Sequence, residues 1–147
     1  MNLYDVRLTQ VRLADITATA VSENDEVEDK KGYNANLHVE IVHPGDGLAV
    51  GDFFEVKIAL LTTESKKPFL QMTMFGTFEI LGEAALTDLG HENAPYELGS
   101  LLYPYIRNLT KPIIEYMGAS AVELPFAPPA PPAKKKKAVR RKKPVTE

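Results

Sequence analysis

The sequence predicts an α+β fold in which a four-stranded antiparallel sheet is covered by a long kinked helix. Four segments have the alternating or doubly apolar pattern of strands, at residues 6–21, 33–42, 53–63 and 69–80. They follow one another with no helical pattern between them, and only a short polar link separates the last two, as in a β-hairpin. The helical pattern comes afterwards. Strands followed by a helix favour an antiparallel α+β domain over alternating βαβ units.

The first and fourth strands have the most informative patterns. Apolar side chains in the first strand change parity twice, which predicts bulges near Thr9 and near Ala14. The second and third strands alternate more regularly, so each is expected to have one buried face. The fourth strand has one apolar face and one mixed face. We expect the apolar face to lie in the core, with Leu70, Met72, Met74, Gly76, Phe78 and Ile80 on it.

The helix is predicted from apolar residues that recur every three or four positions over residues 98–117. Asn93 is placed to cap its start, and Gly118 is placed to end it in a left-handed conformation. Pro104 and Pro112 fall inside the helix, and each removes one backbone hydrogen bond. A kink is therefore expected.

The composition changes after the helix. We predict a folded domain over residues 1–127, followed at 128–147 by a Pro-rich linker and a basic disordered tail. Residues 1–133 hold 9 basic and 19 acidic side chains, a difference of −10, whereas 8 of the 17 basic residues lie in the tail. Residues 22–31 are strongly acidic and form either a solvated connection or a docking patch for a basic partner, such as this tail. The basic tail residues are Lys134, Lys135, Lys136, Lys137, Arg140, Arg141, Lys142 and Lys143.

Several classes of protein are excluded by what the chain lacks. The absence of cysteine excludes disulfides and thiolate sites. No apolar run is long enough to insert into a membrane, and the first residues lack the pattern of a signal peptide, so a cytoplasmic location is expected. His38, His43 and His91 lack the helical spacing of a metal site, and there is no nucleophile motif. We therefore expect no enzyme activity, no cofactor and no metal.

Aromatic and methionine side chains concentrate between residues 69 and 118. Most of them are expected in the core, but one small sheet and one helix cannot bury them all within a monomer. The surplus indicates contacts between copies of the chain or exposed apolar grooves. Methionine and aromatic side chains suit surfaces that accept many different apolar partners.

Four features of the chain resemble the SecB-like protein-export chaperones over about residues 5–126. They are the first strand centred on Asp15, the hairpin at 53–80, the run Leu-Tyr-Pro-Tyr-Ile-Arg at 102–107, and the segment Leu-Pro-Phe-Ala-Pro at 124–128. The resemblance implies a homotetramer built as a dimer of dimers, which holds unfolded polypeptides in apolar grooves without ATP. It implies no catalytic residue. By position, the client-binding residues would be Met74, Phe75, Phe78, Tyr103, Tyr105, Leu124 and Phe126.

Two departures from the family weaken the expectation of protein export. The family binds the SecA motor through acidic residues on the outer surface of its sheet. Asp15 matches one of them, whereas Thr19 and Met72 stand where we expect other carboxylates. The second C-terminal helix of the family is replaced by the Pro-rich segment and the basic tail. A dedicated client, such as an antitoxin or a phage-encoded protein, fits these departures.

The basic tail supports an alternative function. Eight lysine and arginine residues within ten positions can bind phosphates without sequence preference, and aromatic side chains on the sheet could stack single-stranded bases. The chain would then be a single-stranded nucleic-acid-binding protein. The charge of −10 on residues 1–133 argues against this alternative, because a sheet that binds nucleic acid should be basic.

Overall fold

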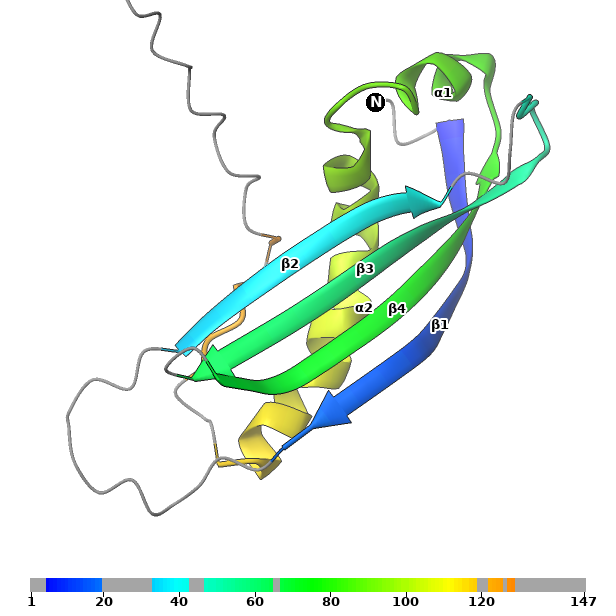
Figure 1. Ribbon diagram of the computed structural model, residues 1–147. Coiled ribbons are helices and arrows are strands. Elements are labelled where there is room, and N and C mark those ends of the chain that lie inside the picture. The colour runs from blue at the N-terminus through cyan, green and yellow to red at the C-terminus, as the bar shows by residue number, and fades with distance from the viewer. Residues whose placement is uncertain are drawn as a thin grey trace, which may run out of the picture.

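The structure is a computed structural model that describes residues 5–19, 33–42, 47–64, 67–118, 122–125 and 127–128. The chain forms β1 (Val6–Ala18), β2 (Tyr33–Val42), β3 (Phe53–Glu64), β4 (Lys67–Ile80), α1 (Glu83–Asp88) and α2 (Ala94–Tyr116). The strands make one antiparallel sheet in the order β1-β4-β3-β2, and α2 runs obliquely across one face of it (Figure 1). The predicted α+β class is confirmed.

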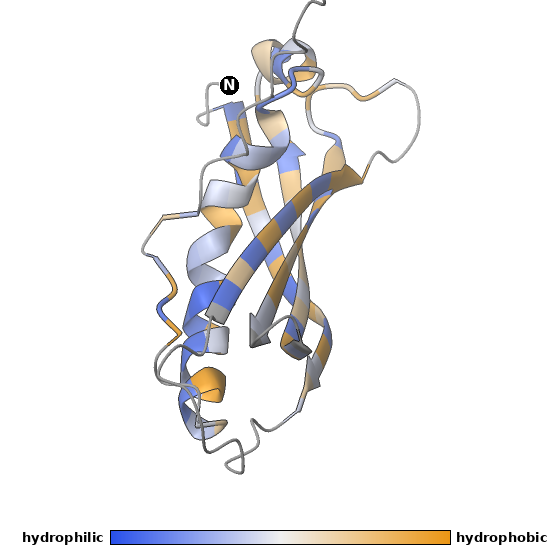
Figure 2. Ribbon diagram, turned by 60° about the vertical axis from the view of Figure 1, so that its left-hand side comes forward, coloured by the Kyte–Doolittle hydropathy of each residue, from blue (hydrophilic) through white to orange (hydrophobic). Residues whose placement is uncertain are grey.

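The two parity changes of the first strand appear as two irregularities in its pairing with β4. One register shift lies between Leu8 and Gln10, and the other lies between Leu13 and Asp15. Because of these shifts, the apolar residues of β1 all point to the face that carries α2, although their spacing in the sequence is irregular. The predicted bulges are confirmed. Figure 2 shows hydrophilic and hydrophobic residues alternating along the strands.

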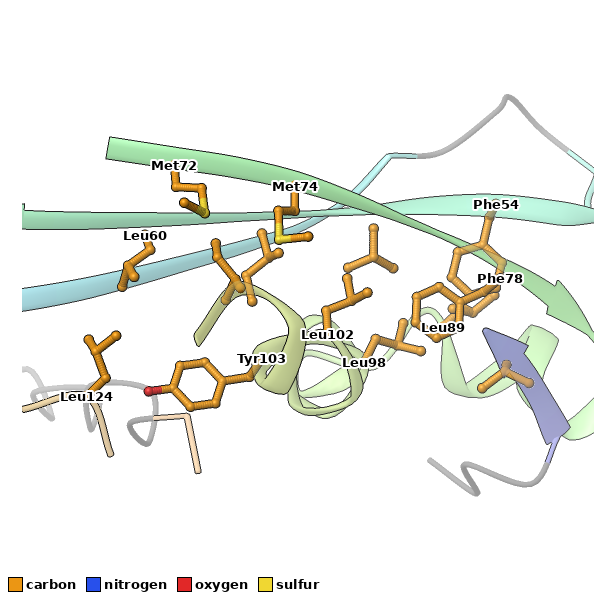
Figure 3. Close-up of a cluster of buried hydrophobic side chains, with 14 of the residues drawn as sticks. Phe54, Leu60, Met72, Met74, Phe78, Leu89, Leu98, Leu102, Tyr103 and Leu124 are labelled. Carbon is orange, nitrogen blue, oxygen red and sulfur yellow. The ribbon is translucent and has the colours of Figure 1, made fainter. Parts of the chain in front are cut away.

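The core lies between α2 and the sheet (Figure 3). From β4 it contains the predicted apolar face, because Leu70, Met72, Met74, Phe78 and Ile80 are all buried. From β3 it contains Phe54, Val56, Ile58 and Leu60, and the ring of Phe54 stacks on that of Phe78 with the centroids 5.5 Å apart. The helix contributes Leu98, Leu102, Tyr103, Ile106 and Ile114.

Two glycines allow α2 to approach the sheet closely. A Cβ atom added to Gly76 in β4 would lie 2.4 Å from Cδ2 of Leu102. One added to Gly99 in α2 would lie 2.7 Å from Cγ2 of Val39 in β2. Real Cβ atoms do not come this close to other atoms, so these two glycines set the height of α2 above the sheet.

The ends of α2 only partly follow the predictions. Gly118 has a positive φ of 79°, as expected for a left-handed residue after a helix. Asn93 occupies the N-cap position, as predicted, but its side chain makes no capping hydrogen bond. The helix runs without a break through Pro104 and Pro112. Both prolines are exposed, so water can reach the backbone carbonyls whose hydrogen bonds they remove.

The acidic segment 22–31, Phe126 and the basic tail lie outside the described residues, and the predictions made for them stay predictions.

The close contact at Gly76 can be tested by Gly76→Ala. The added methyl group must displace Leu102, which is fully buried, so the free energy of unfolding should fall by about 1–3 kcal/mol in urea. Gly90→Ala is the matched control, because its Cβ would lie 3.4 Å from the carbonyl oxygen of Thr87, an ordinary van der Waals distance. The control should stay within about 0.5 kcal/mol of the wild type. Equal stability of the two variants would contradict the packing described above.

Candidate functional site

An extended segment after the helix packs back along one side of α2. We call its described residues, 122–125 and 127–128, the C-terminal strap. The Tyr103 hydroxyl donates a hydrogen bond to the carbonyl oxygen of Pro125 (2.8 Å), and Arg107 Nε donates to that of Leu124 (3.2 Å). The Tyr96 hydroxyl donates to the carbonyl oxygen of Pro128 (2.9 Å). The strap therefore runs antiparallel to the helix.

Tyr103 links the strap to the core. Its side chain is 1% exposed, and Leu124 lies close to its hydroxyl end (Figure 3). Burial raises the pKa of the Tyr103 phenol above its ordinary value of 10.0, and the positive charge of Arg107 partly offsets that rise. The phenol is thus neutral at physiological pH and acts as a hydrogen-bond donor.

A pocket of about 530 Å³ lies between the strap and the second half of α2. The helix contributes Arg107, Lys111, Ile114 and Glu115, and the strap contributes residues 122–125. The strap therefore does not pack tightly along this part of the helix. The pocket combines an apolar floor with charged side chains, so it can receive more than one kind of side chain.

Large apolar side chains are exposed on the opposite side of α2. Tyr105, Leu109 and Tyr116 are 48%, 43% and 93% exposed. Tyr103 and Tyr105 are two residues apart, about 200° around a helix, so Tyr105 faces away from the strap. The C-terminal turns of α2 reach the end of β1 (Figure 1), where Leu13 and Ile16 are 46% and 40% exposed. We call these five residues the β1–α2 patch.

Leu13 and Ile16 are exposed even though they point to the helix side of the sheet. They lie opposite Met74 and Met72 of β4, which are almost completely buried. The difference is that β1 forms the edge of the sheet, beyond the strands that α2 covers best. One edge of β1 also has no partner strand among the described residues.

The outer face of the sheet, which points away from α2, carries paired charges. Arg7 forms an ion pair with Glu79, and Arg12 forms one with Glu55 at 3.0 Å. The guanidinium of Arg12 also lies 4.4 Å from the centre of the Phe75 ring. At one end of this face, a pocket of about 300 Å³ is lined by Val42, Phe53, Phe54, Glu55 and Thr77. Phe53 is 53% exposed there and Val42 is 37% exposed, and we call these two residues the Val42–Phe53 surface.

The structure separates the predicted client-binding residues into several places. Met74 and Phe78 are 3% and 0% exposed in the core, so they are out of reach of a partner in this arrangement. Tyr103 of α2 and Leu124 of the strap are both buried and lie close together. Phe75 lies on the outer face beside Arg12, and Tyr105 is exposed in the β1–α2 patch. Phe126 falls outside the described residues.

The comparison of outer-face carboxylates also needs correction. Asp15 is exposed and pairs with Thr73 on the outer face, and its role in docking a motor stays a prediction. Met72 is fully buried on the other face, so it cannot stand in place of an outer carboxylate. Glu55 and Glu79 are carboxylates of the outer face, and each is paired with an arginine.

Sequence reasoning missed the residues that hold the strap. These are Tyr96 and Arg107, and no motif marks a helix side chain that will bind a carbonyl distant in the sequence. The spacing of Tyr96, Tyr103 and Arg107 at seven and four residues is the available signal, since it places all three on one side of a helix. Leu13 and Ile16 were read as ordinary strand positions.

No metal-binding arrangement is found in the part of the chain that the structure describes. Within those ranges, no three histidine or acidic side chains gather in a way that could hold a metal ion. The exposed His91 has its Nδ1 atom 3.7 Å from Oδ1 of Asp88, which precedes it by three residues. Among the described helices, none is both long and apolar enough to span a membrane.

The role of Tyr103 predicts a stability that depends on pH. The folded state holds the phenol proton more tightly than the unfolded state does. The contribution of Tyr103 to the free energy of unfolding is therefore complete below about pH 10, and it is lost as the pH rises through the raised pKa. Tyr103→Phe removes the hydrogen bond to Pro125, at a cost of about 1 kcal/mol near pH 8. Urea unfolding should show a smaller gap between wild type and variant at pH 11 than at pH 8. A gap that is equal at both pH values would contradict this role.

Comparison with known proteins supports the fold. No protein-family model and no curated protein sequence matches the chain. A SecB-like chaperone of Mycobacterium tuberculosis, solved in complex with a ChAD peptide from the HigA1 antitoxin, has a similar structure. The TM-score is 0.56 at 16% sequence identity, over 84% of this chain and 90% of that chain. The four-stranded antiparallel sheet with its packed helix is therefore a SecB-like fold.

Proposed function

We propose that the chain is an ATP-independent chaperone that holds unfolded or non-native polypeptides, and that it serves a dedicated client protein. The observation that carries this proposal is the exposure of large apolar side chains in two separate places, the β1–α2 patch and the Val42–Phe53 surface. Clustered exposed apolar residues mark interaction sites in soluble proteins. The SecB-like fold supports the proposal, because a chaperone with this fold was solved with a peptide from an antitoxin.

The two surfaces suit different partners. We assign the β1–α2 patch to contacts between copies of the chain, because it borders the edge of a 13-residue strand that has no partner strand among the described residues. A second copy of β1 could pair with that edge, which would satisfy its backbone groups and cover Leu13 and Ile16. A second interface, between two such dimers, would give a homotetramer built as a dimer of dimers. The Val42–Phe53 surface is then left for the client.

A client such as an antitoxin or a phage-encoded protein is better supported than an export substrate. Docking of the SecA motor would require free carboxylates on the outer face, where Asp15 is exposed but Glu55 and Glu79 are paired with arginines. These pairs balance the charge of the surface that the motor would bind. Export coupling and a cytoplasmic location stay predictions.

The outer face also weighs against nucleic-acid binding by the sheet. Its arginines face carboxylates, and Arg12 covers part of the Phe75 ring, which hinders stacking of a base on that ring. Nucleic-acid binding would therefore depend on the tail at residues 134–147, which the structure does not describe.

The proposed client surface can be tested by suppression of aggregation. Wild-type protein should lower the light scattered by a reduced, aggregating protein, and Phe53→Ser should do so several-fold less well because it removes the most exposed ring of the surface. Thr17→Ser is the control, since Thr17 is also exposed but lies near the other end of the sheet, opposite Gln71 of β4, and this variant should suppress aggregation as well as the wild type does.

The same assay separates the chaperone from the nucleic-acid-binding alternative. A chain that ends at residue 133 should suppress aggregation as well as the full chain does. Any binding of single-stranded DNA, measured by fluorescence anisotropy at one fixed salt concentration, should be lost when the tail is removed. A wild-type chain that binds DNA but leaves aggregation unchanged would reject the chaperone function.

A further inference from the structure

Three hydrogen bonds from α2 to the C-terminal strap go to its backbone. Tyr96, Tyr103 and Arg107 each donate a hydrogen bond to a main-chain carbonyl oxygen of the strap. No side chain of the strap takes part in these three bonds. Every residue of any polypeptide carries such a carbonyl, so the same donors can hold an extended chain of a different sequence.

The spacing of the donors matches an extended chain. Tyr96 and Tyr103 are seven residues apart on α2, which corresponds to about 10.5 Å along a helix axis. Their acceptors, the carbonyls of Pro125 and Pro128, are three residues apart, which is about 9.3 Å in a polyproline II conformation. That conformation has three residues per turn, so every third carbonyl points to the same side. Proline has no backbone N–H, but the donors on α2 bind only carbonyl oxygens, so proline is tolerated in the bound segment.

Among the described residues of the strap, one side chain is well buried. Leu124 is 8% exposed, whereas Glu123, Pro125 and Ala127 are exposed and Val122 is half-buried. The pocket of about 530 Å³ beside it leaves room along Lys111 and Ile114. A segment with a larger or additional apolar side chain could therefore bury more surface on α2 than the strap does.

We propose that Tyr96, Tyr103 and Arg107 form a binding site for extended polypeptide, which the strap occupies in cis and which an extended client segment enters when it displaces the strap. The client segment is one that tolerates proline and carries a leucine-sized side chain for the position of Leu124. This inference rests on the proposed chaperone function. It adds that the chain carries its own competitor for the client.

The competition has a measurable consequence. A tethered strap is present at a high effective concentration, so the apparent dissociation constant of the client equals the intrinsic one divided by the fraction of molecules with an open site. Weakening the strap without touching the three donors should therefore tighten client binding. Removing the hydrogen-bond donors of α2 should weaken client binding.

The test uses the full chain and a fluorescently labelled, reduced and carboxymethylated protein that stays unfolded. Leu124→Ser should lower its dissociation constant, measured by anisotropy, by about threefold or more. Ala127→Ser, an exposed change in the same strap, is the control and should leave the constant unchanged. Adding Tyr96→Phe and Tyr103→Phe to Leu124→Ser should raise the constant again, because both rings stay but their hydroxyl donors are lost.

A second measurement covers the case in which Leu124→Ser fails to fold, as judged by circular dichroism. A synthetic peptide with the sequence of residues 122–128 should compete with the labelled client on the wild-type chain, and the same peptide with serine for Leu124 should compete less. A folded Leu124→Ser variant with equal or weaker binding would overturn the strap as a competitor, as would a peptide that does not compete. Absence of client binding by the wild type would instead reject the chaperone function, and this inference with it.

Discussion

One helix has to cover the apolar face of a four-stranded sheet, and the rest of the structure depends on where that helix sits. The missing side chain of Gly76 admits Leu102, and that of Gly99 admits Val39, so α2 is held low over the middle of the sheet. The core forms where α2 packs on the sheet, with most of its contacts to β3 and fewer to β2, β4 and β1. A helix is about 10 Å wide, about the spacing of two or three strands, so it cannot also cover both edges.

The two edges are treated differently. On the β2 side, the chain returns as the C-terminal strap, and Leu124 extends the core under Tyr103. On the β1 side, no described residue covers Leu13, Ile16 or the neighbouring side of α2. The uncovered edge is suited to a second copy of the chain. The covered edge is held by hydrogen bonds that another extended segment could satisfy equally well, so each side of α2 offers a different kind of binding.

The sequence predicted the fold well wherever a local pattern decides the structure. Parity alone located the bulges of β1 and the buried face of β4, and Gly118 was recognised because a left-handed residue favours glycine. The candidate site was less predictable, because parity gives the face of a strand but not how far a helix covers it. Leu13 and Met74 lie opposite each other on the same face, yet only Leu13 is exposed. Similarly, no local signal shows that Tyr96 and Arg107 will bind carbonyls of residues about 17 to 32 positions away.

The central claim is that a single copy of this chain leaves apolar surface beside β1 that further copies must cover. Its most direct test is the molar mass in solution at micromolar concentration, measured by light scattering after size-exclusion chromatography. A tetramer of about four times 16.3 kDa is predicted for the wild type, and smaller species are predicted for Ile16→Asp, which places a charge in the β1–α2 patch. A wild-type mass of 16.3 kDa would contradict the claim.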